Sequence, residues 1–374
     1  MGIIFSSFNG LEPKLRFPNF IEKWTRFEAE NIFKNITDKN HPTDTVLTIQ
    51  QGRGTLPRDL SGRNILYDNT NTKNYKRVQF GDFIIHLRSF EGGLEMANEQ
   101  GIVSPAYTIL RYIKPIAFGF YKAYFRTNEF INHILSKSVE GIRDGKQISY
   151  DAFKWLAIPY CQLEEQQKIA DFLSLVDQRI EKQRQLVESL KKYKRGLLSA
   201  IFDKISSTST LTLGEICNIT TGKLDANAMV VGGKYRFYTC AREYFEIDTY
   251  AFDTDALLIS GNGANVGYIH HYCGKFNAYQ RTYVLDGFQE NIMYIYYYLQ
   301  ANLHPRIEAE KKAGNTPYIV LSTLSDMLIK LPAKERQNNI AKIFAILDKK
   351  IMVENDVLER LNTQKQGLLQ QMFI

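Results

Sequence analysis

The run Gly261–Gly267, with the sequence GNGANVG, is the part of this 374-residue chain that comes nearest to a nucleotide-binding loop. It misses the G-x-G-x-x-G spacing by one residue. The residues that follow, Tyr268 to Tyr272, favour a strand, so no helix N-terminus is expected to face a pyrophosphate. Two interpretations remain: a loop that exposes its backbone to a macromolecular ligand, or an ordinary tight hairpin.

Catalytic constellations are not expected in this chain. His270, His271 and Cys273 lie close together, but no H-E-x-x-H motif or C-x-x-C pair accompanies them, and an exposed turn explains them better than a metal site. No Asn or Asp precedes a Pro-Pro pair, the arrangement that would hold the amino group of a flipped adenine, and no G-x-x-x-x-G-K-[ST] phosphate loop is present. We therefore predict no catalytic residues, no metal and no cofactor for the chain itself.

Other polar residues have the geometry to contact nucleic acid. Arginine can read guanine, asparagine and glutamine can read adenine, and lysine, serine or threonine can bind the phosphate backbone. Each such residue taken alone is more often an ordinary solvated loop residue. Their recurrence in loops at matching places in the two halves of the chain supports DNA contact. The candidates are Gln51, Arg53, Arg88, Ser89, Arg143, Lys146, Gln147, Tyr150, Asn262, Asn265, Tyr279, Gln280, Arg281, Asn315 and Thr316.

The charge balance is compatible with a polyanionic ligand, although many ordinary basic proteins share it. The 47 Lys and Arg residues exceed the 40 Asp and Glu residues, which gives a net charge of +7. The four cysteines are far apart in the sequence, which argues against a zinc cluster or a disulfide framework and favours a reducing, cytoplasmic setting. We expect neither a secretion leader in the first nine residues nor a membrane span.

A gapless internal repeat organises the chain. Residues 164–202 align with residues 335–373 at an offset of 171 residues (335 minus 164), and both copies carry apolar residues at alternating steps of three and four. This is the heptad spacing of paired helices. The predicted pairing seam consists of Ile169, Leu173, Val176, Ile180, Val187, Leu190 and Leu197 in the first copy, and Ile340, Phe344, Leu347, Ile351, Leu358, Leu361 and Leu368 in the second.

Polar residues interrupt the two seams at equivalent positions: Gln183 corresponds to Glu354, and Lys194 to Lys365. A polar residue in a seam lowers stability but penalises wrong registers, so these four residues are interpreted as fixing how the helices pair. The alternative is that their long side chains reach solvent from the edge of the seam.

The segments before the two helices contain short β-branched and aromatic runs broken by Gly, Asn and Asp. They predict an α+β fold in which two similar domains, with mixed or antiparallel sheets and short helices, are separated by two long helices. The helices are expected to form an antiparallel coiled coil with a pseudo-twofold repeat. The predicted parts are a tail at 1–14, a first domain at 15–160, a central helix at 161–205, a second domain at 206–333 and a distal helix at 334–374.

The order of these features resembles the specificity (S) subunit of type I restriction-modification systems. The opening Pro13–Pro18, with Phe20 and Trp24, is similar to the lead-in to that family's first target-recognition domain, as is Gly101–Tyr107. The segments 158–170 and 331–341 resemble the entries to its two conserved helices. The resemblance covers nearly the whole chain.

The resemblance implies a non-catalytic, double-stranded-DNA-binding subunit. In that family each target-recognition domain reads one half of a bipartite sequence, while the helices set the spacer and dock two modification subunits. Those partners methylate adenine at N6 with S-adenosylmethionine, and restriction subunits that use ATP can join them.

Two alternatives stand beside this interpretation: the recognition portion of a fused restriction-methylation enzyme, and a coiled-coil scaffold that does not bind DNA. The lack of catalytic motifs argues against the first alternative. The two glycine-punctuated domains and the positive charge argue against the second.

Overall fold

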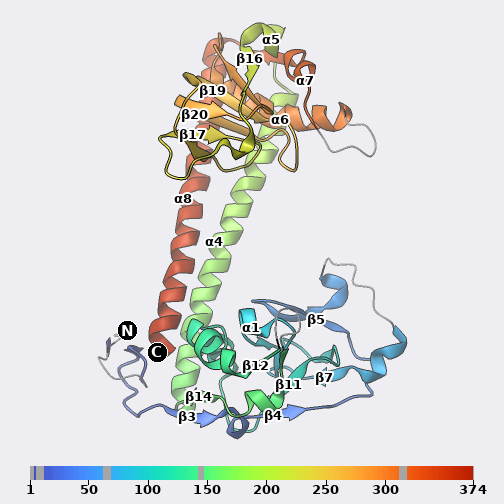
Figure 1. The fold of residues 1–374 in the computed structure, drawn as a ribbon, viewed down its shortest axis with the longest axis vertical. Coiled ribbons are helices and arrows are strands. Elements are labelled where there is room, and N and C mark those ends of the chain that lie inside the picture. The colour runs from blue at the N-terminus through green and yellow to red at the C-terminus, as the bar shows by residue number, and fades with distance from the viewer. Residues whose placement is uncertain (1–3, 6–11, 62–68, 142–146, 311–317, 374) are drawn as a thin grey trace. The chain divides into compact units, whose positions relative to one another are not determined.

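The computed structural model describes residues 4–5, 12–61, 69–141, 147–310 and 318–373. The chain divides into two compact units, which we call unit 1 (Met1–Gln183 with Val357–Ile374) and unit 2 (Arg184–Asp356). Two long helices, α4 (Leu163–Asp203) and α8 (Lys334–Phe373), each contribute residues to both units (Figure 1).

Unit 1 is built on an antiparallel sheet in the order β4-β11-β8-β9. Its strands are β4 (Phe33–Ile36), β8 (Phe83–Ile85), β9 (Glu95–Met96) and β11 (Thr108–Tyr112). Shorter antiparallel pairs flank it: β1 (Ile4–Phe5) with β2 (Leu15–Arg16), β3 (Thr25–Glu28) with β14 (Ala157–Tyr160), β5 (Leu47–Gln50) with β6 (Gly54–Pro57), β7 (Lys76–Val78) with β10 (Gly101–Val103), and β12 (Val139–Glu140) with β13 (Gln147–Ile148). The short helices are α1 (Ser89–Gly92), α2 (Phe118–Tyr124) and α3 (Tyr150–Phe153).

Aromatic side chains fill the main core of unit 1. The Phe33 ring lies 5.3 Å from that of Tyr121, and the Phe83 ring 5.0 Å from that of Phe125, centroid to centroid. Both long helices add to this core, α4 through Ile169 and Leu173 and α8 through Leu369, Met372 and Phe373. The first domain is therefore closed by residues from both copies of the repeat.

The lead-in segment is attached to the first turn of α4 by a buried carboxylate. Arg16 donates from Nε and Nη2 to Glu165 at 2.9 and 2.8 Å, and Trp24 Nε1 donates to the same carboxylate at 3.0 Å. Glu165 is almost fully buried. A buried charge is tolerated only when it is paired and hydrogen-bonded, and these three donors meet that requirement.

Unit 2 is built on a six-stranded mixed sheet in the order β16-β21-β19-β20-β17-β18, in which only the β17–β20 pair is parallel. The strands are β16 (Asn218–Thr221), β17 (Tyr235–Tyr238), β18 (Phe245–Ile247), β19 (Phe252–Ser260), β20 (Ile269–Ala278) and β21 (Thr282–Asp286). The remaining elements are α5 (Leu213–Ile216), α6 (Ile292–Glu310), α7 (Leu321–Ser325), and the pair β15 (Ser209–Thr212) with β22 (Leu328–Leu331). The core of this unit joins α6 to Phe202 of α4 and Phe344 of α8.

Each domain is attached to its long helix in the same way. A buried glutamine near the helix start, Gln166 in α4 and Gln337 in α8, donates to the carbonyl five residues before it, at 2.8 and 2.9 Å respectively. Its side-chain oxygen accepts from the backbone at the start of a domain helix, from Ala117 before α2 or from Asn291 before α6. The strands that precede the two helices, β14 and β22, are related by the same offset of 171 residues. The two copies of the repeat therefore share these hydrogen bonds as well as their sequence.

Within each unit the two long helices run in opposite directions, because the start of one packs beside the end of the other. Reciprocal ion pairs link them: Lys365 with Asp177 at 2.5 Å in unit 1, and Lys194 with Asp348 at 2.6 Å in unit 2. The four charged residues are two repeat-related pairs with their partners exchanged. All fourteen predicted seam residues are buried or half-buried, as are Gln183 and Glu354.

The predicted α+β class, with two domains and two long helices, is confirmed. The predicted similarity of the two domains also has a structural counterpart. β8 pairs with β11 in unit 1, and β19 pairs in the same antiparallel sense with β21 in unit 2.

Candidate nucleic-acid interface

The second domain brings three loops together at one end of the six-stranded sheet. Asn262 and Asn265 lie between β19 and β20, and Tyr279–Arg281 lie between β20 and β21. The Gly261 amide donates to the Arg281 carbonyl at 2.9 Å, and a Cβ at Gly261 would clash with that carbonyl. Gly261–Gly267 therefore connects two antiparallel strands and is held against the next loop by its backbone.

The third loop follows β17. Asn265 donates from Nδ2 to the Cys240 carbonyl at 3.1 Å, and the Cys240 thiol donates to the Arg281 carbonyl at 3.4 Å. Gln280 donates to Asp225 at 2.9 Å. The Arg281 side chain is exposed and makes no hydrogen bond or ion pair with the part of the chain that the structure describes. Asn265 and Gln280 thus connect the loops, and Arg281 presents donors to solvent. Asn262 and Tyr279 lie half-buried beside them.

In the first domain, the turn between β5 and β6 is held by one buried carboxylate. Glu95 accepts from the amides of Gly52 and Gly54 at 2.7 and 2.9 Å and from Arg126 Nη2 at 2.5 Å. Gly54 has φ = +86°, and a Cβ there would lie 2.5 Å from the Met96 carbonyl oxygen. These contacts fix the conformation of the turn, which carries the exposed Gln51 and Arg53.

Gln51 and Arg88 line the same cavity. Its volume is 370 Å³, and its lining includes His86 and Tyr107. Burial lowers the pKa of His86, so this ring is neutral near pH 7. A Cβ at Gly92 of α1 would clash with the Gln51 side chain, and α1 also contacts β13, which carries the exposed Gln147. Gln51, Arg88 and Gln147 are thus gathered around α1.

Two predicted residues, Ser89 and Tyr150, form hydrogen bonds with the backbone of the first domain. Ser89 is fully buried, and its hydroxyl accepts a hydrogen bond from the His86 amide at 2.8 Å. Tyr150 donates its hydroxyl to the Phe33 carbonyl at 3.1 Å and packs on the main core of unit 1. Ser89 is therefore not accessible to a nucleic acid, whereas Tyr150 is half-buried with its hydroxyl bonded to the backbone. Arg143, Lys146, Asn315 and Thr316 lie outside the described residues.

The second domain carries an aromatic and basic strip that was not predicted from the sequence. It consists of Arg236, Tyr238, Arg242, Tyr244, Tyr268, His270 and Tyr272, which are linked by ring and cation–π contacts. The alternation Tyr268, His270, Tyr272 was the available signal, because alternate residues of a strand share one face. Burial lowers the pKa of His270, whose Nε2 lies 3.1 Å from the Ala241 carbonyl.

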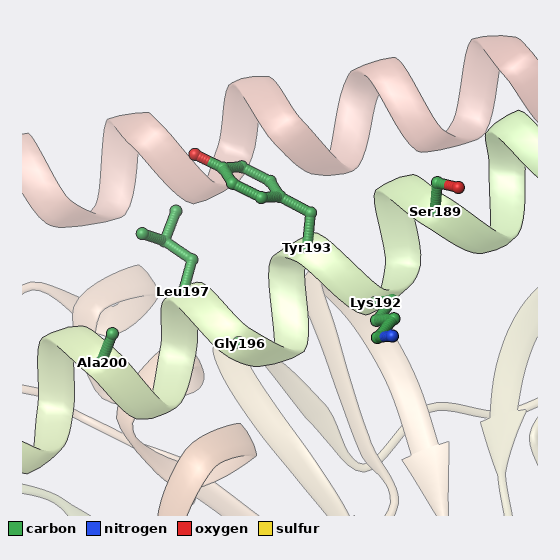
Figure 2. A pocket seen from close by; sticks show the side chains of 6 residues that line it. All are labelled: Ser189, Lys192, Tyr193, Gly196, Leu197 and Ala200. Carbon is green, nitrogen blue, oxygen red and sulfur yellow. The ribbon is translucent and has the colours of Figure 1, made fainter.

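A shallow groove of 530 Å³ lies on α4 in unit 2 and is lined by Ser189, Lys192, Tyr193, Gly196, Leu197 and Ala200. Figure 2 shows Tyr193 and Leu197 projecting from the same side of the helix. At Gly196 and its repeat equivalent Gly367, a Cβ would meet nothing within 4 Å. Both glycines thus mark open surface.

Within the described parts of the chain, no group of three or more His, Cys, Asp or Glu residues is arranged to hold a metal ion. None of the helices described is long and apolar enough to cross a lipid bilayer. The candidate interface therefore offers hydrogen-bond donors and aromatic rings, which the sheets support.

The chain belongs to the type I restriction modification DNA specificity domain family, whose model matches residues 27–192 and again 206–363. It is 41% identical over 133 residues to the type I restriction enzyme EcoDI specificity subunit of Escherichia coli, a match that covers 36% of this chain and 29% of that protein's length. It is 23% identical to a putative type I specificity subunit of Mycoplasma genitalium, with 97% of each chain covered. The duplicated family match coincides with the internal repeat.

Solved structures show the same fold. The S subunit of a type I restriction-modification system from M. genitalium aligns with a TM-score of 0.61 at 20% identity, covering 97% of this chain and 99% of that one. A chain from a study of complex assembly and conformational transition of the type I R-M system aligns with a TM-score of 0.58 at 16% identity, covering 94% and 97%. The chain is thus a type I specificity protein that contains two DNA-specificity domains.

Proposed function

We propose that this chain is a specificity subunit in which the domains at 15–160 and 206–333 each read one half of a bipartite duplex sequence. The observation that carries the proposal is that each domain gathers polar donors on loops whose backbones are fixed by neighbouring strands. Gln51, Arg88 and Gln147 form one such group, and Asn262 and Arg281 belong to the other. Reading base edges requires donors in a fixed geometry, and rigid sheets supply it.

We further propose that the helices at 161–205 and 334–374 set the spacer and dock two adenine-N6 methyltransferase subunits. Apolar side chains exposed on the helices support this role, since exposed apolar surface often marks a binding site for a partner. These are Leu175, Leu186, Tyr193, Ile343, Ile346, Met352 and Val353. The partners would supply the catalysis and use S-adenosylmethionine, and ATP-dependent restriction subunits would join the same assembly. Because its target is genomic DNA, we expect the complex to work in the cytoplasm.

The first prediction concerns selection from a pool of random DNA duplexes. The purified chain, alone and with a type I methyltransferase subunit, is incubated with the pool, and the bound duplexes are sequenced. We expect two short sequence blocks at a fixed separation. Methyl transfer by the chain alone would instead establish an enzyme, and the lack of any enrichment with the partner would contradict a DNA-reading role.

The second prediction concerns the helices. Deleting residues 182–188 from α4 and 354–360 from α8 removes one heptad from each and keeps both apolar ladders in phase. Seven residues of helix span about 10 Å, or about three base pairs of duplex. The same selection should therefore return both blocks with a shorter spacer. Inserting one heptad in each helix is the matched control and should lengthen the spacer. An unchanged spacer in both variants would show that the helices do not set it.

A further inference from the structure

The guanidinium of Arg236 lies close to two aromatic rings. Its central carbon lies 4.3 Å from the ring centroid of Tyr244 and 4.5 Å from that of Tyr272. The three residues come from β17, from the segment before β18, and from β20. Contacts with tyrosine rings from two other segments restrict the guanidinium, and its N–H groups remain able to donate.

Most N–H donors of Arg236 form no hydrogen bond with the residues that the structure describes. Its Nη1 donates to the Tyr238 hydroxyl at 3.3 Å, and it makes no ion pair with the residues that the structure describes. Glu246 stands opposite Arg236 on β18, but its carboxylate accepts from the Gly232 amide at 2.8 Å. The hydrogen bond to Tyr238 raises the pKa of Arg236 above its already high value, so the guanidinium stays charged. Of its five N–H groups, at least three are left for a ligand.

Arg236 belongs to the same surface as the three loops. The Tyr238 ring lies 5.0 Å from that of His270, which lies 4.8 Å from that of Tyr268. Arg242 lies over Tyr268 at 5.8 Å and donates from Nε to Asn265 at 3.2 Å. A continuous line of contacts therefore runs from Arg236 to the loop at 261–267.

We propose that Arg236 reads a guanine in the half of the target bound by the second domain, donating two hydrogen bonds to O6 and N7 in the major groove. This inference rests on the proposed function. Arginine can bind a phosphate or a guanine through two parallel hydrogen bonds. Guanine O6 and N7 lie in the plane of the base, so the paired bonds to guanine also require the guanidinium to have a set orientation. The two tyrosine rings provide that orientation before DNA binds.

The test repeats the selection, with the methyltransferase subunit present, for the unaltered chain and for Arg236→Gln and Arg236→Lys. Lysine keeps the charge but lacks the fork. We expect both variants to lose the preference for guanine at one position of one block. Affinity for the selected site should fall about 10- to 100-fold, while the other block is retained. Selection at the other positions of the altered block shows that the second domain is folded, and the retained block shows that the first domain is folded.

Lys275→Gln is the matched control. Lys275 lies on β20 of the same sheet, 4.7 Å over the ring of Tyr250, and outside the aromatic and basic strip. Its removal should leave both blocks unaltered. Equal weakening on all sequences, with guanine still preferred, would identify a phosphate contact and overturn the proposal. The failure of the unaltered chain to select any sequence would overturn the proposed function itself.

Discussion

Replacing Phe373 with alanine is expected to destabilise unit 1 by about 3–5 kcal/mol and to leave unit 2 intact. Phe373 is 3% exposed. Its ring lies 5.1 Å from Phe120, 5.6 Å from Tyr124 and 6.2 Å from Trp24. Truncation removes these contacts and leaves a cavity in a core that is largely aromatic. Hydrogen exchange should therefore accelerate in α2 and in the sheet of unit 1.

The repeat supplies a reciprocal experiment. Phe202 is the equivalent residue in the first copy, and its ring packs 5.3 Å from Tyr298 and 5.7 Å from Tyr294 in unit 2. Phe202→Ala should accelerate exchange in α6 and spare α2. Gln371→Ala, at an exposed position two residues before Phe373, is the control and should change neither unit. Equal acceleration in both units from either phenylalanine variant would contradict the assignment of each helix end to one core.

Replacing Glu95 with glutamine is expected to destabilise unit 1 by about 3–5 kcal/mol, because it breaks a buried ion pair from one side. The Glu95 side chain is fully buried and its partner Arg126 is 20% exposed. A glutamine would also present its amide NH2 group to the donors of Gly52, Gly54 or Arg126, so at least one hydrogen bond is lost. The free energy of unfolding of unit 1, measured by hydrogen exchange in increasing urea, reports the combined loss of the ion pair and the hydrogen bond.

The same substitution should alter DNA selection in only one block. Without the Glu95 carboxylate the turn at 51–53 is no longer fixed, so the block read by the first domain should become degenerate while the other block is kept. Asp151→Asn is the matched loss of charge, since the Asp151–Lys154 pair is a surface interaction that contributes little. Intact selection by both domains in Glu95→Gln would show that this turn does not contact DNA.

The helices could be predicted from the sequence because heptad spacing is a local pattern that survives in a single chain. Residues 161–205 and 334–374 were expected to be helical, and α4 and α8 occupy Leu163–Asp203 and Lys334–Phe373. The two domains were likewise expected from their short β-branched and aromatic runs. Pairing residues such as Asp177 and Lys365 were visible as repeat identities, but only the structure shows that partners are exchanged between copies.

The candidate interface was harder to predict, because burial and partners depend on residues far apart in the sequence. Ser89 and Tyr150 have the same chemistry as the other predicted contact residues. Only the structure shows that Ser89 is buried and that the Tyr150 hydroxyl is bonded to a backbone carbonyl. Arg236 was not predicted because its aromatic neighbours are far from it in the sequence. They are Tyr244 and Tyr272, and the second of them lies on β20, which pairs in parallel with β17.

The contribution of α8 to the first core has a consequence for synthesis on the ribosome. Residues 12–160 are translated early, yet Leu369, Met372 and Phe373 complete the hydrophobic cluster that they form. Until those positions have emerged, Trp24, Phe120 and Tyr124 lack a neighbour and present apolar surface to chaperones and proteases. A polypeptide interrupted before residue 369 would therefore leave this hydrophobic cluster incomplete.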